Sequence, residues 1–265
     1  MLITLSPSKG QDFELAAPTQ THTIPVQLDD SVVLIENLKK LSKEDIKDMM
    51  SISENLSELN FNRYHDFSTP FTQQNAKQAL FAFKGDVYSG INTASMNQAD
   101  YEYAQNHLRI LSGLYGSLKP LDLIQPYRLE MKTKLPTSRG ENLYQFWAQS
   151  ITDQLNESLE NQKEKIVVNL ASQEYWKSVK PKELNGTVIN VAFKENKDGK
   201  SRIIAIFAKK ARGMMADFLI RNRVETVEGI KGFDYADYKF DANASTDDLF
   251  VFTRMQPPPM TKNKK

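Results

Sequence analysis

The chain has 265 residues, 40% of them hydrophobic, which is enough for one sizeable core. The formal net charge is only +1, so any attraction to a polyanion must come from a local patch of charge. There is no cysteine, and the three histidines are not at metal-ligand spacing. Disulfides, thiolate catalysis and cysteine-ligated metals are excluded, and we expect no bound metal or other cofactor.

The N-terminal stretch "MLITLSPSKG" lacks the basic region and the apolar core of a signal peptide. No apolar run approaches the roughly 20 residues that a membrane-spanning helix needs. We therefore expect a cytoplasmic, monomeric protein that does not associate with membranes.

Residues 1–6 read as a short strand that is closed by the loop "SPSKG". Pro7 and Gly10 punctuate this loop, which carries Lys9. The next twenty residues are polar and show no clear period.

Residues 42–50 and 53–60 read as two short helices joined by "SIS", which is a helix-hairpin-helix in outline. Ser42 with Asp45 resembles a capping box, and Ser51 with Glu54 fits the capping pattern better. The apolar residues of both helices predict one buried side for the pair.

Four segments follow in the middle of the chain. "ALFAFKGDVYSG" predicts an apolar strand running into a Gly-Asp turn, and "MNQADYEYAQNHLRILSGLYG" predicts a helix ending near Gly113 or Gly116. Pro120 and Pro126 make "SLKPLDLIQPYRLEM" a non-helical crossing segment. "NLYQFWAQSITDQLNESLENQ" predicts one long amphipathic helix.

The last third predicts strands around one further helix. "KIVVNLAS" is typical of a buried strand, and "TVINVAF" and "SRIIAIFA" flank a hairpin signal at Asp198-Gly199. A helix follows "KKARG", and "DLFVFTRM" predicts a last strand. Together the elements predict a mixed α/β (α+β) fold with a single domain over residues 1–255 and a flexible basic tail at 256–265.

Charge is unevenly distributed in this part of the chain. Nine basic and three acidic residues lie between Asn190 and Arg223, whereas seven acidic and two basic residues lie between Val224 and Phe250. Lys194, Lys197 and Lys200 are typical of a solvated hairpin tip. The acidic stretch would fold back on the basic one or dock a basic partner.

Lys209, Lys210 and Arg212 stand out because they lie at the expected junction of a strand and a helix. The start of a helix already carries positive charge, so these cations would be tolerated if a phosphate or carboxylate bound there. Gly213 would let such a ligand approach the backbone. The alternative is a structural ion pair with Glu130 or Glu174.

Six segments in register resemble the YaaA family of bacterial peroxide-stress proteins. They are "SPSK" after the first strand, "FKGDVYSG", "LRILSGLYGSLKPLDLIQPYRLEM", "NLASQEYWK", "FAKKARGMM" and "FVFTR", and the whole match runs in order from Leu2 to Arg254. The resemblance implies a cantaloupe-type fold with a mixed sheet, surrounding helices, a positively charged cleft and a helix-hairpin-helix element at about residues 41–60. It also implies a cytosolic DNA-binding protein of the oxidative stress response that is linked to iron homeostasis and to limiting iron-driven DNA damage.

The cleft residues carry over onto cations that each fall inside a matching segment: Lys9, Lys84, Arg128, Lys209, Lys210 and Arg212. Such side chains would follow the phosphates of duplex DNA, branched or distorted forms included, without reading sequence. Ser51 and Ser53 of the hairpin could offer hydroxyls to one phosphate, although the usual hairpin glycine is absent. Tyr88, Tyr115 and Tyr127 could stack on exposed bases or pack in the interior.

A different function remains open, namely an enzyme that acts on a nucleotide-like or nucleoside-like anion in the same cleft. Glu130, Glu174 and Lys9 are its candidate catalytic residues, since paired carboxylates and cations serve general acid–base chemistry. A structural salt-bridge network would explain the same residues. Asp86, Asp122, Glu130 and Glu174 could also supply oxygen ligands to a hard cation, although their spacing does not require it.

Overall fold

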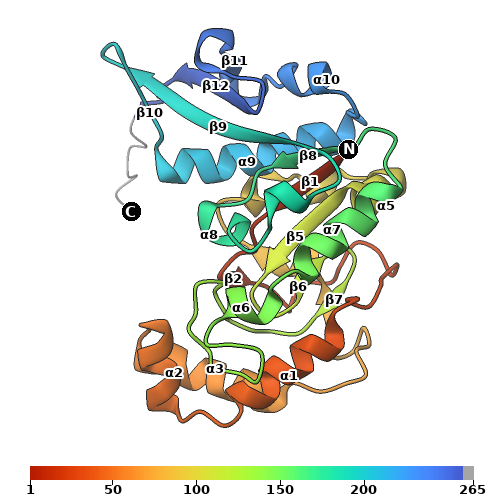
Figure 1. Cartoon of the computed structure of the whole chain (residues 1–265), viewed down its shortest axis with the longest axis vertical. Coiled ribbons are helices and arrows are strands. Elements are labelled where there is room, and N and C mark those ends of the chain that lie inside the picture. The colour runs from red at the N-terminus through yellow and green to blue at the C-terminus, as the bar shows by residue number, and fades with distance from the viewer. Residues whose placement is uncertain (259–265) are drawn as a thin grey trace.

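The computed structural model describes residues 1–258 of the chain (Figure 1). Most of the basic tail predicted at 256–265 therefore lies outside the described residues. The limits of the single domain predicted over residues 1–255 stay a prediction.

A mixed eight-stranded sheet forms the centre of the fold and confirms the predicted mixed α/β class. Its parallel strands are β1 (Leu2–Leu5), β5 (Leu108–Ser112), β8 (Ile166–Asn169), β9 (Thr187–Lys197) and β12 (Leu249–Met255). Antiparallel strands at its margins are β6 (Gly116–Leu118), β10 (Lys200–Arg202) and β11 (Lys239–Phe240). β1, β5 and β8 are buried along their whole length, as parallel strands covered on both faces are.

The order of the strands places β1 between two parallel neighbours that the chain reaches on opposite sides. The sheet runs β11-β12-β9-β8-β1-β5-β6, so β1 lies between β5 and β8. The chain goes from β1 to β5 on one side and later returns to β8 on the other side. Because all three strands are parallel, the loops that follow them leave the sheet at one edge.

Helices and two small sheets surround this centre. α9 (Ala205–Arg221) and α5 (Gln98–His107) contact each other and β1, and α7 (Ser150–Glu160) contacts β6. The remaining α-helices are α1 (Leu28–Leu38), α4 (Ala79–Ala82), α6 (Leu143–Trp147), α8 (Gln173–Trp176) and α10 (Val227–Lys231). The short 3-10 helices are η1 (Tyr88–Gly90), η2 (Thr93–Ser95), η3 (Pro181–Glu183), η4 (Tyr235–Asp237) and η5 (Ala242–Ala244). The small sheets pair β2 (Gly10–Gln11) with β4 (Phe83–Lys84), and β3 (Lys77–Gln78) with β7 (Leu123–Ile124).

The two predicted short helices are present as α2 (Lys43–Met50) and α3 (Glu54–Asp66), at the other end of the molecule from α9 (Figure 1). Ser42 and Asp45 form a capping box, but the cap of α3 is Ser53 and not the predicted Ser51. Ser51 instead ends α2 in the left-handed conformation. Lys43 and Lys47 pair with acidic residues of α3, so this hairpin presents no basic face. Its identity as a DNA-binding helix-hairpin-helix is not confirmed and stays a prediction.

Four predicted elements were wrong in type or extent. α5 ends at His107, because "LRILS" is the buried strand β5. "ALFA" forms α4, and only two residues at each side of it pair as strands. The expected long helix is broken into α6 and α7 at Ala148, which has a φ of 41°. "IIAIFA" is not a strand, since α9 begins at Ala205.

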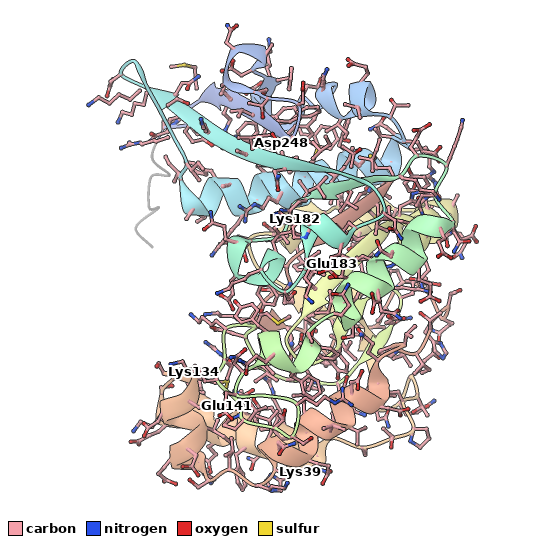
Figure 2. The ribbon with its side chains drawn as sticks, viewed as in Figure 1. Lys39, Lys134, Glu141, Lys182, Glu183 and Asp248 are labelled. Carbon is pink, nitrogen blue, oxygen red and sulfur yellow. The ribbon has the colours of Figure 1, made fainter. Side chains whose placement is uncertain are left out.

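Charged side chains lie mainly on the outside of this fold. Figure 2 labels Lys134, Glu141, Lys182, Glu183 and Asp248, all of which are exposed. Within residues 1–258, no helix combines the length and the apolar content that crossing a membrane requires.

Candidate anion-binding site

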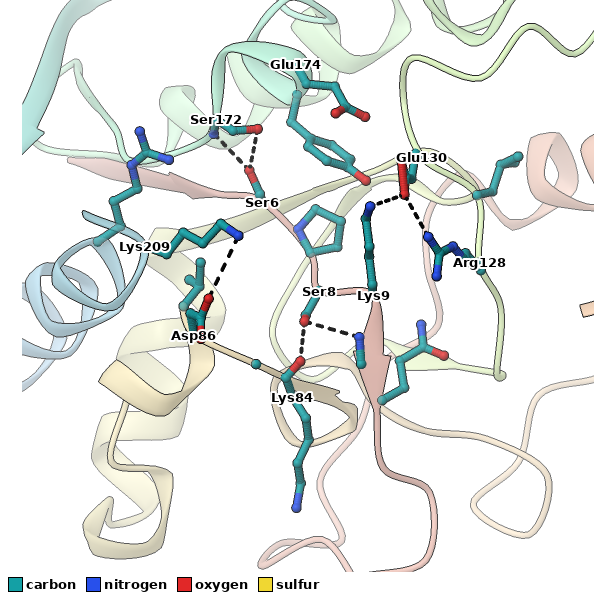
Figure 3. A pocket seen from close by; sticks show the side chains of 18 of the residues that line it. Ser6, Ser8, Lys9, Lys84, Asp86, Arg128, Glu130, Ser172, Glu174 and Lys209 are labelled. Atoms are coloured by element: carbon teal, nitrogen blue, oxygen red, sulfur yellow. Dashed lines mark hydrogen bonds and ion pairs between the residues drawn. The ribbon is translucent and has the colours of Figure 1, made fainter. Parts of the chain in front are cut away.

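A cavity of about 520 Å³, here called the basic pocket, lies at the carboxyl ends of β1 and β8 (Figure 3). Five segments line it: residues 6–11 after β1, residues 84–87, residues 127–130, the segment after β8 with Ser172 and with Glu174 and Tyr175 of α8, and α9 with Lys209 and Arg212. The lining contains five basic residues and three acidic ones, Asp86, Glu130 and Glu174. The fold therefore brings together five of the six predicted cleft cations. The side chain of Lys84 points away from Lys9 and Lys209, and its ammonium pairs with Asp12 (Figure 3).

The loop that carries Lys9 is tied to the segment that carries Lys84. Ser8 donates a hydrogen bond to the carbonyl oxygen of Lys84, and the backbone N–H of Gly10 donates to Ser8 Oγ over 3.3 Å. Gly85 has a φ of +137°, and a Cβ there would lie 2.5 Å from Ser8 Oγ. A side chain at residue 85 would thus separate the two segments.

The ends of β1 and β8 are joined beneath the pocket. The N–H of Ser172 donates to Ser6 Oγ over 2.8 Å, and the two serine hydroxyl oxygens lie 3.3 Å apart (Figure 3). The hydroxyl of Tyr88 donates to the carbonyl oxygen of Ser6 over 3.1 Å. These bonds fix the floor of the pocket against the sheet.

Glu130 is the main counter-charge in the pocket. Its carboxylate lies 2.5 Å from the ammonium of Lys9, 3.2 Å from the guanidinium of Arg128 and 3.5 Å from the ammonium of Lys132. Burial alone would raise the pKa of this carboxyl, but the hydrogen bond from Lys9 and the charges of Lys132 and Arg128 outweigh it and lower that pKa. Glu130 is therefore an ionised anchor for cations, which makes it a poor proton donor.

Two of the other cations also have carboxylate partners. The ammonium of Lys84 lies 2.6 Å from Asp12, and that hydrogen bond is the main reason why the pKa of Asp12 is well below its usual range. The ammonium of Lys209 lies 3.8 Å from Asp86 (Figure 3). The predicted alternative of structural ion pairs is thus realised with Asp86 for Lys209, and not with Glu130 or Glu174.

The position of the three α9 cations corrects the prediction. Because α9 begins at Ala205, Lys209, Lys210 and Arg212 lie inside the helix and not at its N-terminus. Lys209 and Arg212 are three residues apart, share one face of the helix and both line the pocket. Lys210 is exposed on another face and does not line it. Gly213 is buried against Val87 and so is closed to any ligand.

Arg212 differs from the other cations. Among the described residues no carboxylate lies within ion-pair distance of its guanidinium, and none of their side chains or backbone groups makes a hydrogen bond with it. Removal from water lowers the pKa of this guanidinium. The Nε of Arg128 is also buried and, within residues 1–258, has no hydrogen-bond partner. The pocket therefore keeps cationic donors that the described protein groups do not satisfy.

The predicted base-stacking tyrosines are not available for stacking. Tyr88, Tyr115 and Tyr127 are buried, and their hydroxyls bond to Ser6, to the N–H of Gln125 and to Ser112, respectively. Tyr175 is the tyrosine that lines the pocket with part of its surface exposed. Its position in "NLASQEYWK", just after a buried strand, was the signal for it, as it was for Ser172.

The remaining predicted residues divide between pocket and periphery. Ser51 and Ser53 do not line the basic pocket. Glu174 does, and its carboxylate accepts a 3.3 Å hydrogen bond from the N–H of Lys132. Asp122 is buried elsewhere, bonded to Thr23 and to the N–H of Lys119. In the described part of the chain, no group of three or more His, Asp or Glu is arranged to hold a metal ion.

The acidic and basic stretches at the C-terminal end do not neutralise each other through ion pairs. Within residues 1–258, none of the ion pairs links an acid of residues 224–250 to a base of residues 190–223. Glu228 instead pairs with Lys231 inside the acidic stretch. The acidic stretch does fold back on the basic one, since η4 contacts α9 and Tyr235 packs on Phe218, but direct ion pairs between the two stretches are absent from residues 1–258.

The model of the family described as peroxide stress protein YaaA covers residues 1–244, which include every segment of the basic pocket.

Proposed function

The chain belongs to the YaaA family of peroxide stress proteins. We propose that it protects the cell under peroxide stress by binding DNA phosphates at the basic pocket. The observation that carries this proposal is the convergence of Lys9, Lys84, Arg128, Lys209 and Arg212 from four separate segments of the chain. DNA affinity that depends on such contacts is electrostatic and indifferent to sequence.

The ion pairs of the pocket do not prevent phosphate binding. The side chains of Lys9, Lys84 and Lys209 are 62%, 53% and 55% exposed, respectively, although each has a carboxylate partner. Only the pair of Lys209 with Asp86 is exposed at both partners, and such a pair contributes little free energy, about 0–1 kcal/mol. A phosphate group can therefore replace Asp86 at Lys209 with little loss, while Arg212 has no carboxylate partner among the described residues.

Protection of DNA against peroxide would follow from the part of the DNA that the protein covers. A bound protein covers the phosphate backbone, which is where iron ions would otherwise collect and react with peroxide. In this view the link to iron is indirect, because the described residues contain no metal-binding group of acidic and imidazole side chains.

Titration of a fluorescent duplex at several salt concentrations tests the proposal. The logarithm of the binding constant should fall linearly with the logarithm of the salt concentration. Lys209→Glu combined with Arg212→Glu should weaken binding to all sequences alike and reduce that slope by about 2.

Lys210→Glu is the matched control, because Lys210 lies in the same helix and does not line the pocket. Failure to retain duplex at low salt would refute the proposal. An equal loss of affinity in the Lys210→Glu control would refute the assignment to the pocket.

A further inference from the structure

The basic pocket occupies the place in the sheet where small ligands bind in open α/β folds. The connection from β1 leads to β5, whereas the connection from β8 leads away to β9 on the opposite side. The loops after two neighbouring parallel strands therefore diverge, and a crevice opens between them at the carboxyl edge. The segment after β1 lines the pocket with Ser6 to Gln11, and the segment after β8 lines it with Ser172 and with Glu174 and Tyr175 of α8.

The size of the pocket fits a small molecule better than it fits a helix of DNA. Its volume of about 520 Å³ lies within the roughly 300–1,000 Å³ typical of small-ligand sites. A duplex could place one of its phosphates at the mouth of the pocket, but the interior has room for only one small molecule.

The lining combines the groups that a nucleotide needs. Arg212 and Lys209 supply positive charge for a phosphate, and Pro7, Val87, Leu129 and Tyr175 supply apolar surface for a flat ring. Ser6 can donate its hydroxyl hydrogen to Ser172 Oγ at 3.3 Å, which leaves the hydroxyl hydrogen of Ser172 available to a ligand.

We propose that the basic pocket binds a free phosphorylated small molecule of mononucleotide size, with its phosphate on Arg212 and its ring against the apolar wall. This inference rests on the anion-binding role proposed above, and it adds a ligand that is not part of a DNA chain. The dianionic end of such a phosphomonoester satisfies the guanidinium that no described carboxylate neutralises.

Isothermal titration with deoxyadenosine monophosphate, deoxyadenosine and inorganic phosphate tests the inference on the full chain. Deoxyadenosine monophosphate should bind with one site per chain. Deoxyadenosine and inorganic phosphate should each bind about tenfold more weakly or worse, since each lacks half of the contacts.

Two variants locate the phosphate. Arg212→Met should weaken nucleotide binding about tenfold or more, and Lys209→Met should weaken it by a smaller factor. Lys210→Met is the control and should bind as the unaltered chain does. Thermal unfolding of each variant shows that it is folded, and Lys209→Met serves as the test if Arg212→Met is not.

Three results would overturn the inference: no nucleotide binding up to millimolar concentration, inorganic phosphate that binds as tightly as the nucleotide, or affinity that neither Arg212→Met nor Lys209→Met changes. A fluorescent duplex titrated into the same preparation separates the two proposals. Duplex binding without nucleotide binding refutes this inference alone, and nucleotide binding without duplex binding refutes the DNA proposal alone.

Discussion

Gly213 of α9 packs directly on the backbone of Val87, so closely that a Cβ on Gly213 would lie 1.8 Å from the carbonyl oxygen of Val87. The contact is reciprocal, since a Cβ on Gly90 would lie 2.3 Å from the carbonyl oxygen of Lys210. α9 and the segment of residues 87–90 can approach each other this closely only because Gly213 and Gly90 both lack a side chain. Val87 lines the basic pocket and Arg212 precedes Gly213, so this contact sets where the guanidinium lies.

Gly213→Ala should therefore both destabilise the protein and displace Arg212. We expect the free energy of unfolding to fall by about 1–3 kcal/mol, the usual effect of overpacking, together with weaker duplex binding. Urea unfolding followed by circular dichroism measures the first effect. Lys210→Ala in the same helix should stay within about 0.5 kcal/mol of the unaltered chain. A Gly213→Ala protein of unchanged stability would show that α9 is not packed this closely.

Arg212→Met should separate stability from binding. The guanidinium is partly removed from water and has no carboxylate partner among the described residues, so an apolar side chain of similar length should raise the free energy of unfolding by about 0.5–1 kcal/mol. Duplex affinity should fall at the same time. Thermal unfolding and fluorescence anisotropy on one preparation check both effects. A loss of stability would mean that the guanidinium has a stabilising partner.

Glu130→Gln should change how stability depends on pH. The folded-state pKa of Glu130 is lowered below the value of about 4.3 in an unfolded chain. The contribution of the ionised Glu130 to the free energy of unfolding is therefore fully present above that value, and it is lost as the pH falls through the folded-state pKa. We expect the variant to be about 1 kcal/mol less stable at pH 7, because the exposed side chains of Lys9 and Lys132 weaken the pairs.

The stability difference between Glu130→Gln and the unaltered chain should shrink when urea unfolding is repeated below pH 4. Glu36→Gln is the control, since Glu36 makes an exposed pair with Lys39 and should change little at either pH. A Glu130→Gln difference that stays constant with pH would rule out the charge as its cause.

The buried carboxylate of Glu195 should matter more for stability than any pair in the pocket. Its side chain is 1% exposed, lies 2.9 Å from Nε of Arg254 and accepts a hydrogen bond from Tyr238. Glu195→Gln leaves the guanidinium without its carboxylate and should lower the free energy of unfolding by about 3 kcal/mol. A double-mutant cycle with Arg254→Met measures the coupling, and additive effects would show that the two residues do not interact.

Ala148 marks the break between α6 and α7, with a φ of 41° and a ψ of −104°. A side chain is strained in this conformation, so Ala148→Gly should raise the free energy of unfolding by about 0.5–1 kcal/mol. Ala211→Gly, inside α9, is the matched control and should lower it by about 1 kcal/mol. Thermal unfolding distinguishes the two, and a loss of stability in Ala148→Gly would contradict the expectation.

Local sequence patterns predicted correctly those helices and strands that have a continuous apolar run or clear signals at their ends. The strands at residues 1–6 and in "KIVVNLAS", and the capped helices α2 and α3, have continuous burial or explicit end signals. The patterns failed at "LRILS", "ALFA" and "IIAIFA", which are short apolar runs that fit a strand and a buried helix equally well. Pairing with β1 decides the first, and packing in the interior decides the second. The third is largely exposed, with Ile203 at 59% and Ile206 at 51%, and α9 begins within it at Ala205.

The sequence by itself determined the family, the mixed α/β class and which chain segments carry the cations. It could not determine that Lys209 and Arg212 face the pocket while Lys210 does not, because that depends on where α9 begins and on how Gly213 packs against Val87. Nor could it show that Glu130 holds Lys9 and Arg128 while Arg212 lacks a carboxylate partner within residues 1–258. Distances between charges far apart in the chain are set by the order of the strands, and only the folded chain fixes them.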